Sequence, residues 1–530
     1  MMEKVLLLVA VIILACTVAR RLSGRLGVPA LLLFMALGML FGSDGLVQIH
    51  FDDFWLAEQT CSVALIFIMF YGGFGTRWDA AKPIAGKAIC LSTLGVVLTA
   101  FLTGLFCYFA LGFTMLESFL TGAVISSTDA ASVFSILRSK KLNLRENTAS
   151  LLEVESGSND PASYMLTVIA LSLMGKGEQE NIAFLIFGQL AFGIALGVLV
   201  AGLSIFVLRR LKLADGTDTI FATAAALLAF ALPAAVGGNG YLGAYLAGII
   251  LGNSKIPHKV SLVHFFDGIT GLAQILIFFL LGLLSFPRQL PSVALPAVGI
   301  ALFLTFVARP AAVFAILAPF RCSWRQILLT SWAGLRGAAS IVFAITAVAS
   351  GVEIGHDLFH IVFCISLLSV AVQGSLLPWV SRKLGMVDAS DSVNRTFTDY
   401  QYERQMNLTQ FRITEGHPWA EKTIADCRFP DDALVVNVRH EGENLLPKGS
   451  TPLRVGDIVV LSTPAYVDDG DVGLRELPVK DEWEGKLVRE LDVPAKILIV
   501  LIKRSDGTTV VPRGDTVVDK GDILVVNETD

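Results

Sequence analysis

The first 385 residues consist of long apolar segments separated by short polar loops. A helix that crosses the hydrocarbon core of a bilayer needs about 20 apolar residues. Segments of about this kind recur thirteen times, and the ninth is the shortest. They cover residues 4–20, 28–45, 58–75, 88–112, 118–137, 149–174, 182–208, 218–236, 240–254, 262–284, 292–318, 326–350 and 357–380. The pattern predicts an all-α membrane domain with about 13 transmembrane helices.

The pattern of apolar positions changes near residue 386. Short apolar strands bounded by turn residues replace the long apolar segments, and charged residues become frequent. The shift predicts a transmembrane domain over residues 1–385, a linker over 386–403, and two small α+β domains over 404–470 and 471–530.

The tail contains a tandem repeat. Residues 419–463 align with residues 483–527, so that Trp419 matches Trp483 and Pro430 matches Pro494. After one inserted residue, Gly456-Asp457 matches Gly521-Asp522. Each copy shows a short helical signal, an apolar strand, a turn and a second strand. A repeat of this length indicates two copies of one small module.

Composition and charge placement support a membrane protein and suggest its orientation. Of all residues, 54% are hydrophobic and only 16% are charged, whereas soluble proteins carry about a quarter charged residues. With the amino terminus outside, the loops on the inner side hold 19 Lys and Arg and those on the outer side hold 3. Because cytoplasmic loops are rich in Lys and Arg, we expect a multi-pass protein of the cell (inner) membrane with a cytoplasmic tail. The bilayer is the expected partner, and no nucleic acid is expected.

Two apolar segments are interrupted by polar residues. In the fifth, Asp129 follows Ser126, Ser127 and Thr128, and in the twelfth Arg336 stands between glycines. Unwound backbone inside a membrane is tolerated where it lines a cavity. Interrupted helices in corresponding halves of a chain are typical of inverted-repeat transporters with a site at the midplane. Arg309 is a second arginine inside an apolar segment.

The sixth segment carries the densest group of polar residues. Glu155 and Asn159 are four residues apart, as are Ser156 and Asp160, so each pair shares a helical face. Ser156 and Asp160 offer hydroxyl and carboxylate oxygens to one point, which suits an alkali cation. Structural alternatives remain. Asp129 or Glu155 could be a packing acid paired with an arginine, Glu153 could be interfacial, and Asp267 and Asn239 are left open.

At the stretch E-S-G-S-N-D-P, residues 155–161, the sequence resembles the cation:proton antiporter superfamily in its NhaP-type branch. The resemblance covers nearly all of residues 1–385, with supporting matches at Thr128-Asp129, at 334–337 and at 372–374. The tail resembles the TrkA-C half of RCK regulatory domains. Together the two parts resemble potassium/proton antiporters of the cell volume regulation protein A type. One departure is Ala130, where the family usually has proline.

The resemblance implies roles for these residues. Asp160 is expected to bind the ion and the proton, with Ser156, Thr128 and Asp129 completing the coordination of K⁺ or Na⁺. Asn159 is expected to order the crossing broken helices, and Glu155 to pair with Arg336 or Arg309.

The resemblance also has implications for the whole molecule. Asn-Asp in place of Asp-Asp implies electroneutral exchange, and the family fold implies a homodimer in which a core domain slides. No cofactor is expected, while a nucleotide effector of the tail, such as cyclic di-AMP, is left open.

Three alternatives compete with potassium/proton exchange. The transported ion could be sodium, because the tail favours potassium only by association. An RCK-gated potassium channel is disfavoured because no T-V-G-Y-G filter occurs. A membrane enzyme is disfavoured because neither G-x-S-x-G nor H-E-x-x-H occurs.

Overall fold

The computed structural model divides into two compact units, Met1–Tyr402 and Glu403–Asp530, and each is described by itself. Within them the structure describes residues 2–26, 29–140, 142–175, 181–211, 216–388, 406–429, 433–440, 443–445, 447–464, 474–479, 481–493, 497–504, 509–510 and 512–528.

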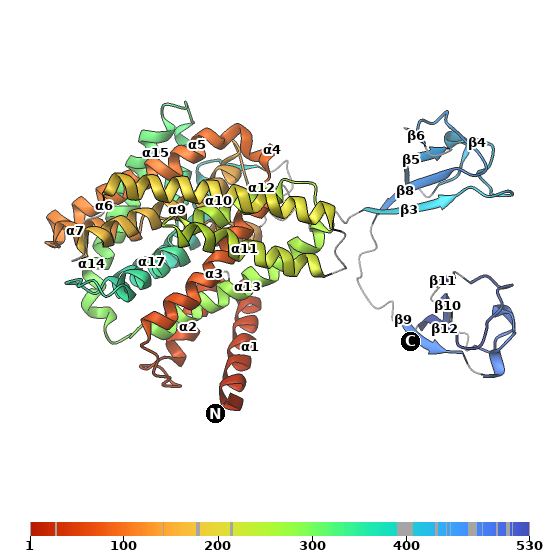
Figure 1. The fold of residues 1–530 in the computed structure, drawn as a ribbon, viewed down its shortest axis with the longest axis horizontal. Coiled ribbons are helices and arrows are strands. Elements are labelled where there is room, and N and C mark those ends of the chain that lie inside the picture. The colour runs from red at the N-terminus through yellow and green to blue at the C-terminus, as the bar shows by residue number, and fades with distance from the viewer. Residues whose placement is uncertain are drawn as a thin grey trace. The chain divides into compact units, whose positions relative to one another are not determined.

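The first unit is built from helices (Figure 1). Its first half contains α1 (Met2–Leu26), α2 (Ala30–Phe41), α3 (Phe54–Gly75), α4 (Trp78–Ala81), α5 (Ala85–Cys90), α6 (Val96–Leu111), α7 (Met115–Val124), α8 (Ala130–Ser139) and α9 (Thr148–Met174). Its second half contains α10 (Ile182–Arg210), α11 (Thr217–Ala235), α12 (Gly240–Gly252), α13 (Lys259–Leu284), α14 (Leu290–Phe303), α15 (Arg309–Leu317), α16 (Trp324–Trp332), α17 (Ala338–Ala349), α18 (Leu358–Leu368) and α19 (Ser375–Lys383).

Each predicted membrane segment coincides with one helix or with an interrupted helix. Among the described residues, 8 helices are long and apolar enough to cross a membrane, and 4 shorter apolar helices accompany them. The predicted fold class, an all-α polytopic membrane domain followed by two small α+β domains, is therefore confirmed, and the described residues of the tail are mainly strands. Three of the spans contain a widened π-helical turn, at Leu91–Gly95, Leu304–Ala308 and Ser369–Gly374.

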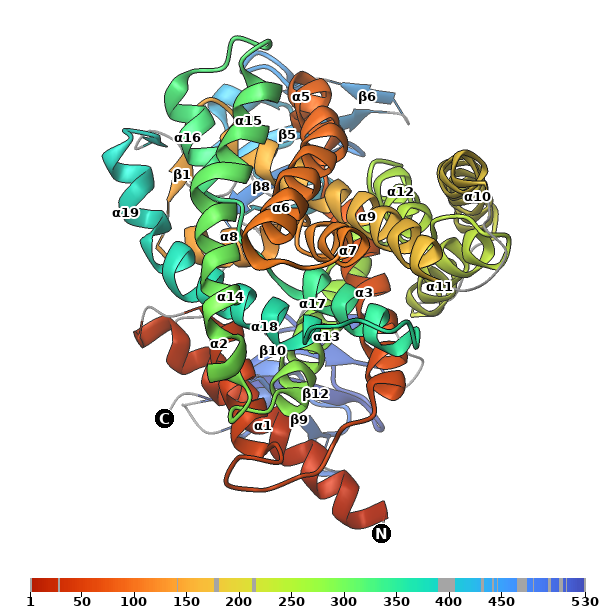
Figure 2. The same ribbon diagram turned by 90° about the vertical axis from the view of Figure 1, so that its left-hand side faces the viewer.

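The helices pack in two groups. Helices α1–α3 and α10–α13, called the scaffold helices here, pack mainly against one another. Helices α5–α9 and α14–α19, called the site helices here, form the second group. Figure 2 shows α10, α11 and α12 together, apart from α14, α15 and α16. This division matters because both interrupted helices belong to the second group.

Glycines allow the scaffold helices to approach one another closely. A Cβ at Gly73, Gly248 or Gly252 would overlap a backbone carbonyl oxygen across the α3–α12 contact. Because lipid tails are as apolar as side chains, helix association in a membrane depends on such close packing. On α10, Gly193 likewise lies against α12, whereas Gly202 faces open space.

A short β-pair ties the end of the membrane unit to the site helices. Strand β1 (Asn143–Leu144) lies between α8 and α9, and pairs antiparallel with β2 (Val387–Asp388), directly after α19. The Arg145 backbone N–H donates to the Met386 carbonyl oxygen over 2.9 Å. The segment that follows α19 thus pairs with the loop that joins the two site helices α8 and α9.

The tail holds two sheets of the same topology. The first has the order β3 (Met406–Arg412), β8 (Ile458–Pro464), β5 (Leu434–His440) and β6 (Glu443–Leu445), with a separate pair β4 (Lys422–Thr423) and β7 (Pro452–Leu453). The second has the order β9 (Leu474–Pro478), β12 (Ile523–Glu528), β10 (Ile497–Lys503) and β11 (Thr509–Val510).

The repeated Gly-Asp forms the same contact in both modules. The buried Asp457 carboxylate contacts the His440 ring at 2.5 Å, and the buried Asp522 carboxylate contacts the Arg504 guanidinium at 2.6 Å. Each carboxylate also accepts a backbone N–H three residues earlier, from Arg454 or from Asp519. The repeat read from the sequence is therefore a repeat of structure.

Replacing Gly248 with alanine should destabilise the membrane unit, because its methyl group would overlap the Phe70 carbonyl oxygen and force α3 and α12 apart. Overpacking typically costs about 1–3 kcal/mol. We expect a lower thermal unfolding midpoint for Gly248→Ala in detergent, measured by size-exclusion chromatography after heating. Gly202→Ala is the matched control, since that position is open. Equal midpoints for the two variants would contradict the packing argument.

Candidate functional site

Two extended segments cross within the site helices. Helix α7 ends at Val124 and α8 begins at Ala130, while α16 ends at Trp332 and α17 begins at Ala338. The Asp129 backbone N–H donates to the Leu335 carbonyl oxygen over 2.8 Å, which joins the two segments directly. A side chain at Gly337 would overlap the Asp129 carboxylate, so the crossing requires glycine there. Both predicted helix breaks are present.

Arg336 lies in the extended segment between α16 and α17 and binds the extended segment between α7 and α8. Its guanidinium Nη1 donates to the carbonyl oxygens of Ser126 and Ser127, over 2.7 and 2.5 Å. These carbonyls lie where α7 has stopped, so they lack helical partners of their own. The Arg336 backbone N–H donates to Ser369 Oγ over 3.0 Å, and Ser369 donates to Gln373 Oε1 over 2.5 Å. The motif at 372–374 thereby supports the second break.

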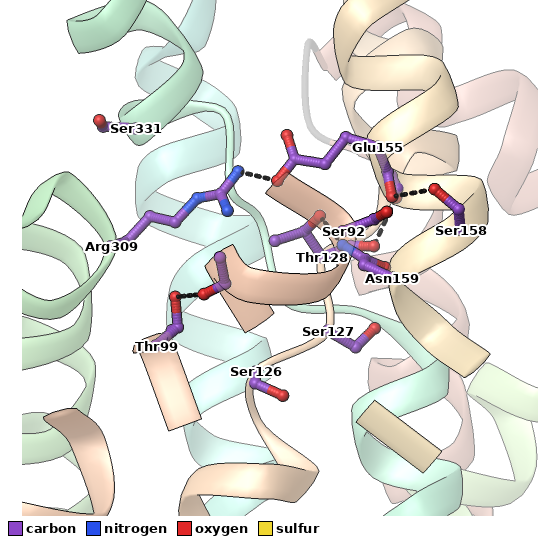
Figure 3. Close-up of polar contacts among 12 residues, drawn as sticks. Ser92, Thr99, Ser126, Ser127, Thr128, Glu155, Ser158, Asn159, Arg309 and Ser331 are labelled. Atoms are coloured by element: carbon purple, nitrogen blue, oxygen red, sulfur yellow. Dashed lines mark hydrogen bonds and ion pairs between the residues drawn. The ribbon is translucent and has the colours of Figure 1, made fainter. Parts of the chain in front are cut away.

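Helix α9 binds the first extended segment through two side chains. Asn159 Nδ2 donates to Thr128 Oγ1, and Ser156 Oγ donates to the Thr128 carbonyl oxygen, each over 2.5 Å. Figure 3 shows Asn159 on α9 close to Thr128. All three residues are buried. Asn159 and Ser156 therefore fix the position of the segment that precedes Asp129.

The two carboxylates of the site have different partners. Asp160 is buried and accepts a hydrogen bond from Ser127 Oγ. Asp129 accepts from Ser132 Oγ over 2.5 Å and from the Ser132 backbone N–H over 3.3 Å, which places it at the amino end of α8. A carboxylate at a helix N-terminus is stabilised by the helix dipole. Asp129 thus caps a helix, while Asp160 faces a serine hydroxyl.

Glu155 and Arg309 form a buried ion pair. Arg309 Nη2 lies 2.5 Å from Glu155 Oε1, and both side chains are at most 3% exposed (Figure 3). Arg309 begins α15 directly after a π-helical turn. Of the two partners expected for Glu155, the structure places Arg309 against it, and Arg336 lies on the backbone of the first break instead.

A cavity of about 330 Å³ reaches Asp160. Ser156, Thr128 and Asp129 line it as well, and two further acids, Glu153 and Asp267, lie along it. The Tyr71 hydroxyl donates to Asp267 Oδ1 over 3.3 Å.

Every lining residue on α9 lies at or before Asp160. Because α9 begins close to β1, which pairs with β2, the cavity extends along the part of α9 that lies between the β1–β2 pair and Asp160.

The structure brings most of the predicted site residues together. Asp160, Ser156, Thr128 and Asp129 share the cavity, while Asn159 and Arg336 hold the extended segments in place. Sequence reasoning did not select Ser127, the hydrogen-bond partner of Asp160, nor Ser132 and Ser369. Serine is common in helix caps and loops, so only the crossing itself distinguishes these three.

Comparison with protein families identifies both parts of the chain. The family model described as "Sodium/hydrogen exchanger, transmembrane" matches residues 8–383, which is more than half of the chain. The chain belongs to the sodium/hydrogen exchanger family. The TrkA-C domain model matches the tail twice, at residues 408–465 and 474–526. This exchanger is thus a multi-span membrane protein with a cytoplasmic TrkA-C tail.

Relatives and solved structures agree with this family. The exchanger is 35% identical to "K(+)/H(+) antiporter NhaP" of Alkalimonas amylolytica, over 88% of this chain and 82% of the relative. It is 34% identical to "K(+)/H(+) antiporter NhaP2" of Shewanella sp. strain MR-4, over 82% of this chain and 77% of the relative. The sodium proton antiporter MjNhaP1 of Methanocaldococcus jannaschii shares the fold, with a TM-score of 0.64 at 23% identity over 72% of this chain and 99% of that one.

These findings decide between the classes of function left open by the sequence. The exchanger is a monovalent cation/proton antiporter, a secondary transporter rather than an enzyme. The prediction of an antiporter is confirmed over the alternatives of a potassium channel and a membrane enzyme.

Glu155→Gln should destabilise the exchanger strongly, because it leaves the Arg309 guanidinium buried without its counter-charge. Removing one partner of a buried pair costs about 3–5 kcal/mol. We expect early loss of the folded species on heating in detergent. The double variant Glu155→Gln/Arg309→Gln removes both charges and should recover much of the loss. A double variant no more stable than the single one would show that charge is not what the pair contributes.

Proposed function

We propose that this protein exchanges K⁺ for H⁺, one for one, at the single carboxylate of Asp160. The observation that carries the proposal is that Asp160 is buried and lines a cavity, and that the residue before it is an asparagine, which cannot titrate. Two relatives at 34–35% identity carry the name K⁺/H⁺ antiporter. The family name leaves sodium as the alternative ion.

Oxygen atoms around Asp160 suit an alkali cation. In the cation-loaded state the ligands are the Asp160 carboxylate, Ser156 Oγ and Thr128, joined directly or through water by Asp129. Ser127 Oγ, which now donates to Asp160, can rotate and offer a lone pair instead. In the proton-loaded state, Asp160 carries the proton and needs no counter-ion. Because either a cation or a proton neutralises the one carboxylate, each exchange moves no net charge.

Exchange requires that Asp160 face each side of the membrane in turn. We propose that the site helices move as a body against the scaffold helices, with Asn159 and Arg336 keeping the crossing segments together during the motion. A cation and a proton then share one binding place, and their competition couples the two fluxes without any further device.

We propose that the TrkA-C tail regulates exchange. The β1–β2 pair supports this, because it joins the residues leading into the tail to the loop between α8 and α9. A homodimer and an amino terminus on the outer side are further parts of the proposal, the latter supported by the placement of Lys and Arg.

Asp160→Asn should abolish K⁺-induced proton movement in everted vesicles, since a side-chain amide has no acidic proton to exchange at neutral pH and carries no negative charge to balance a cation. The measurement is cation-induced dequenching of a pH-sensitive dye, with K⁺ and Na⁺ compared. Asp218→Asn is the matched control, because Asp218 is a buried carboxylate on α11 that contacts His258, away from the cavity. Retained exchange in Asp160→Asn would move the site elsewhere.

The same vesicles distinguish the alternatives. A response to Na⁺ alone would keep the mechanism and change the ion. Exchange that generates or follows a membrane potential would contradict the one-for-one stoichiometry.

Removing residues 394–530 should leave exchange but change its dependence on pH or on a tail ligand, for which cyclic di-AMP is the first to add. Val387→Pro, in an otherwise complete chain, should give the same change, because proline disrupts β2 and so separates the segment that precedes the tail from the α8–α9 loop. Both are measured in the dye assay. Unchanged kinetics in the truncated protein would reduce the tail to a structural appendage.

A further inference from the structure

Asp160 is the last residue of α9 that lines the cavity, and aromatic rings pack around the next turn of that helix. Tyr164 lies one turn beyond Asp160 on the same helical face. Its ring centroid is 4.9 Å from that of Tyr241 on α12 and 5.6 Å from that of Phe343 on α17. Tyr241 in turn contacts Phe230 of α11 at 4.9 Å. Site helices and scaffold helices therefore meet in an aromatic cluster, Tyr164, Tyr241, Phe343 and Phe230, on the far side of Asp160.

A buried amide crosses the same boundary. Asn239 precedes α12, and its Nδ2 donates to the carbonyl oxygen of Pro161, the residue after Asp160, over 2.8 Å. Asn239 is only 1% exposed. The bond joins a scaffold helix to the ion-binding helix beside the carboxylate, so relative sliding of the two groups must break it.

The rest of Asn239 is fixed to the scaffold. Its Oδ1 accepts the Leu242 backbone N–H over 3.0 Å, which caps α12, and its own N–H donates to the Gln189 carbonyl oxygen over 3.0 Å. A Cβ at Gly193 would press on the Asn239 carbonyl oxygen. Because these contacts already fix the Asn239 side chain, forming the Nδ2 bond to Pro161 costs little side-chain entropy.

We propose that Asn239 is a latch that, with the aromatic cluster, closes the path from Asp160 to the outer side while the cavity is open to the cytoplasm. The inference rests on the proposed alternating exposure of Asp160. One buried amide–carbonyl bond changes the ratio of two conformations by about two- to tenfold. Asn239 thereby sets the balance between inward-open and outward-open forms, acting as a positioning residue that touches no ion.

The test measures accessibility rather than transport. The seven native cysteines are replaced, and one cysteine is placed at Gln274, a half-buried residue that lines the cavity. A small, positively charged, membrane-impermeant thiosulfonate is added from the outer side of proteoliposomes of known orientation. Asn239→Ser keeps an oxygen that can cap α12 but is too short to reach Pro161. We expect outside labelling to become about two- to tenfold faster, and labelling from the tail side to become slower.

Asn253→Ala is the matched control. Asn253 follows α12 at its other end, and its Nδ2 donates to the Thr76 carbonyl oxygen over 2.8 Å, a contact between scaffold segments. Its loss should leave labelling from both sides unchanged. Equal outside labelling of Asn239→Ser and the parent would overturn the latch, and equal acceleration by Asn253→Ala would assign the effect to general loosening.

The failure of the latch is separable from the failure of the proposed function. Unchanged labelling in Asn239→Ser, with K⁺ exchange still abolished by Asp160→Asn, removes the latch and leaves the antiporter. A shift in labelling without K⁺ exchange keeps the latch and changes the transported ion.

Discussion

Unwound backbone inside a membrane must find hydrogen-bond partners within the protein, and the proposed ion site depends on how this chain provides them. Each unpaired amide or carbonyl in hydrocarbon costs several kcal/mol. The two breaks supply partners for each other through the Asp129–Leu335 bond and through Arg336. From α9, Ser156 donates to the Thr128 backbone carbonyl oxygen and Asn159 donates to the Thr128 hydroxyl. Positions around Asp160 are thus set by the need to satisfy backbone, before any ion arrives.

As a consequence, each charged group of the site has a different structural role. Arg336 serves the backbone, Glu155 and Arg309 neutralise each other, and Asp129 caps a helix. Both Asp129 and Asp160 accept a hydrogen bond from an uncharged serine hydroxyl, but Asp129 also accepts a backbone N–H at the amino end of α8. A neutral partner does not balance the negative charge of the Asp160 carboxylate, which leaves that charge to be balanced by an exchangeable proton or cation. This is the electrostatic condition that the proposed competition between a proton and a cation at Asp160 requires.

The sequence predicted the membrane segments, the two breaks and the tandem tail, because hydropathy, polar runs inside apolar segments and repeated Gly-Asp pairs are local signals. It also selected Asp160 with Asn159 and Ser156, since their spacing along one helix can be recognised in the sequence without knowledge of the fold. Ser127 and Asn239 could not be singled out in the same way. Their partners, Asp160 and Pro161, lie 33 and 78 residues away, and such pairings arise only when helices cross. The choice of Arg309 over Arg336 as partner of Glu155 likewise depends on which face of α15 meets α9.

The π-helical turns at Leu91–Gly95, Leu304–Ala308 and Ser369–Gly374 bear on this last point. A regular helix advances about 100° per residue, so one extra residue in a turn rotates everything beyond it around the helix axis. A single span can then present lipid-facing side chains along one half and site-facing side chains along the other without bending away from its neighbours. The second π turn ends at Ala308, so the phase of α15, and with it the direction of Arg309, is set there. The third contains Ser369 and Gln373 within its widened turn. Apolar positions that recur with the 3.6-residue period of an α-helix before the π-helical turn therefore shift to another face of the helix after it, although the helix itself continues.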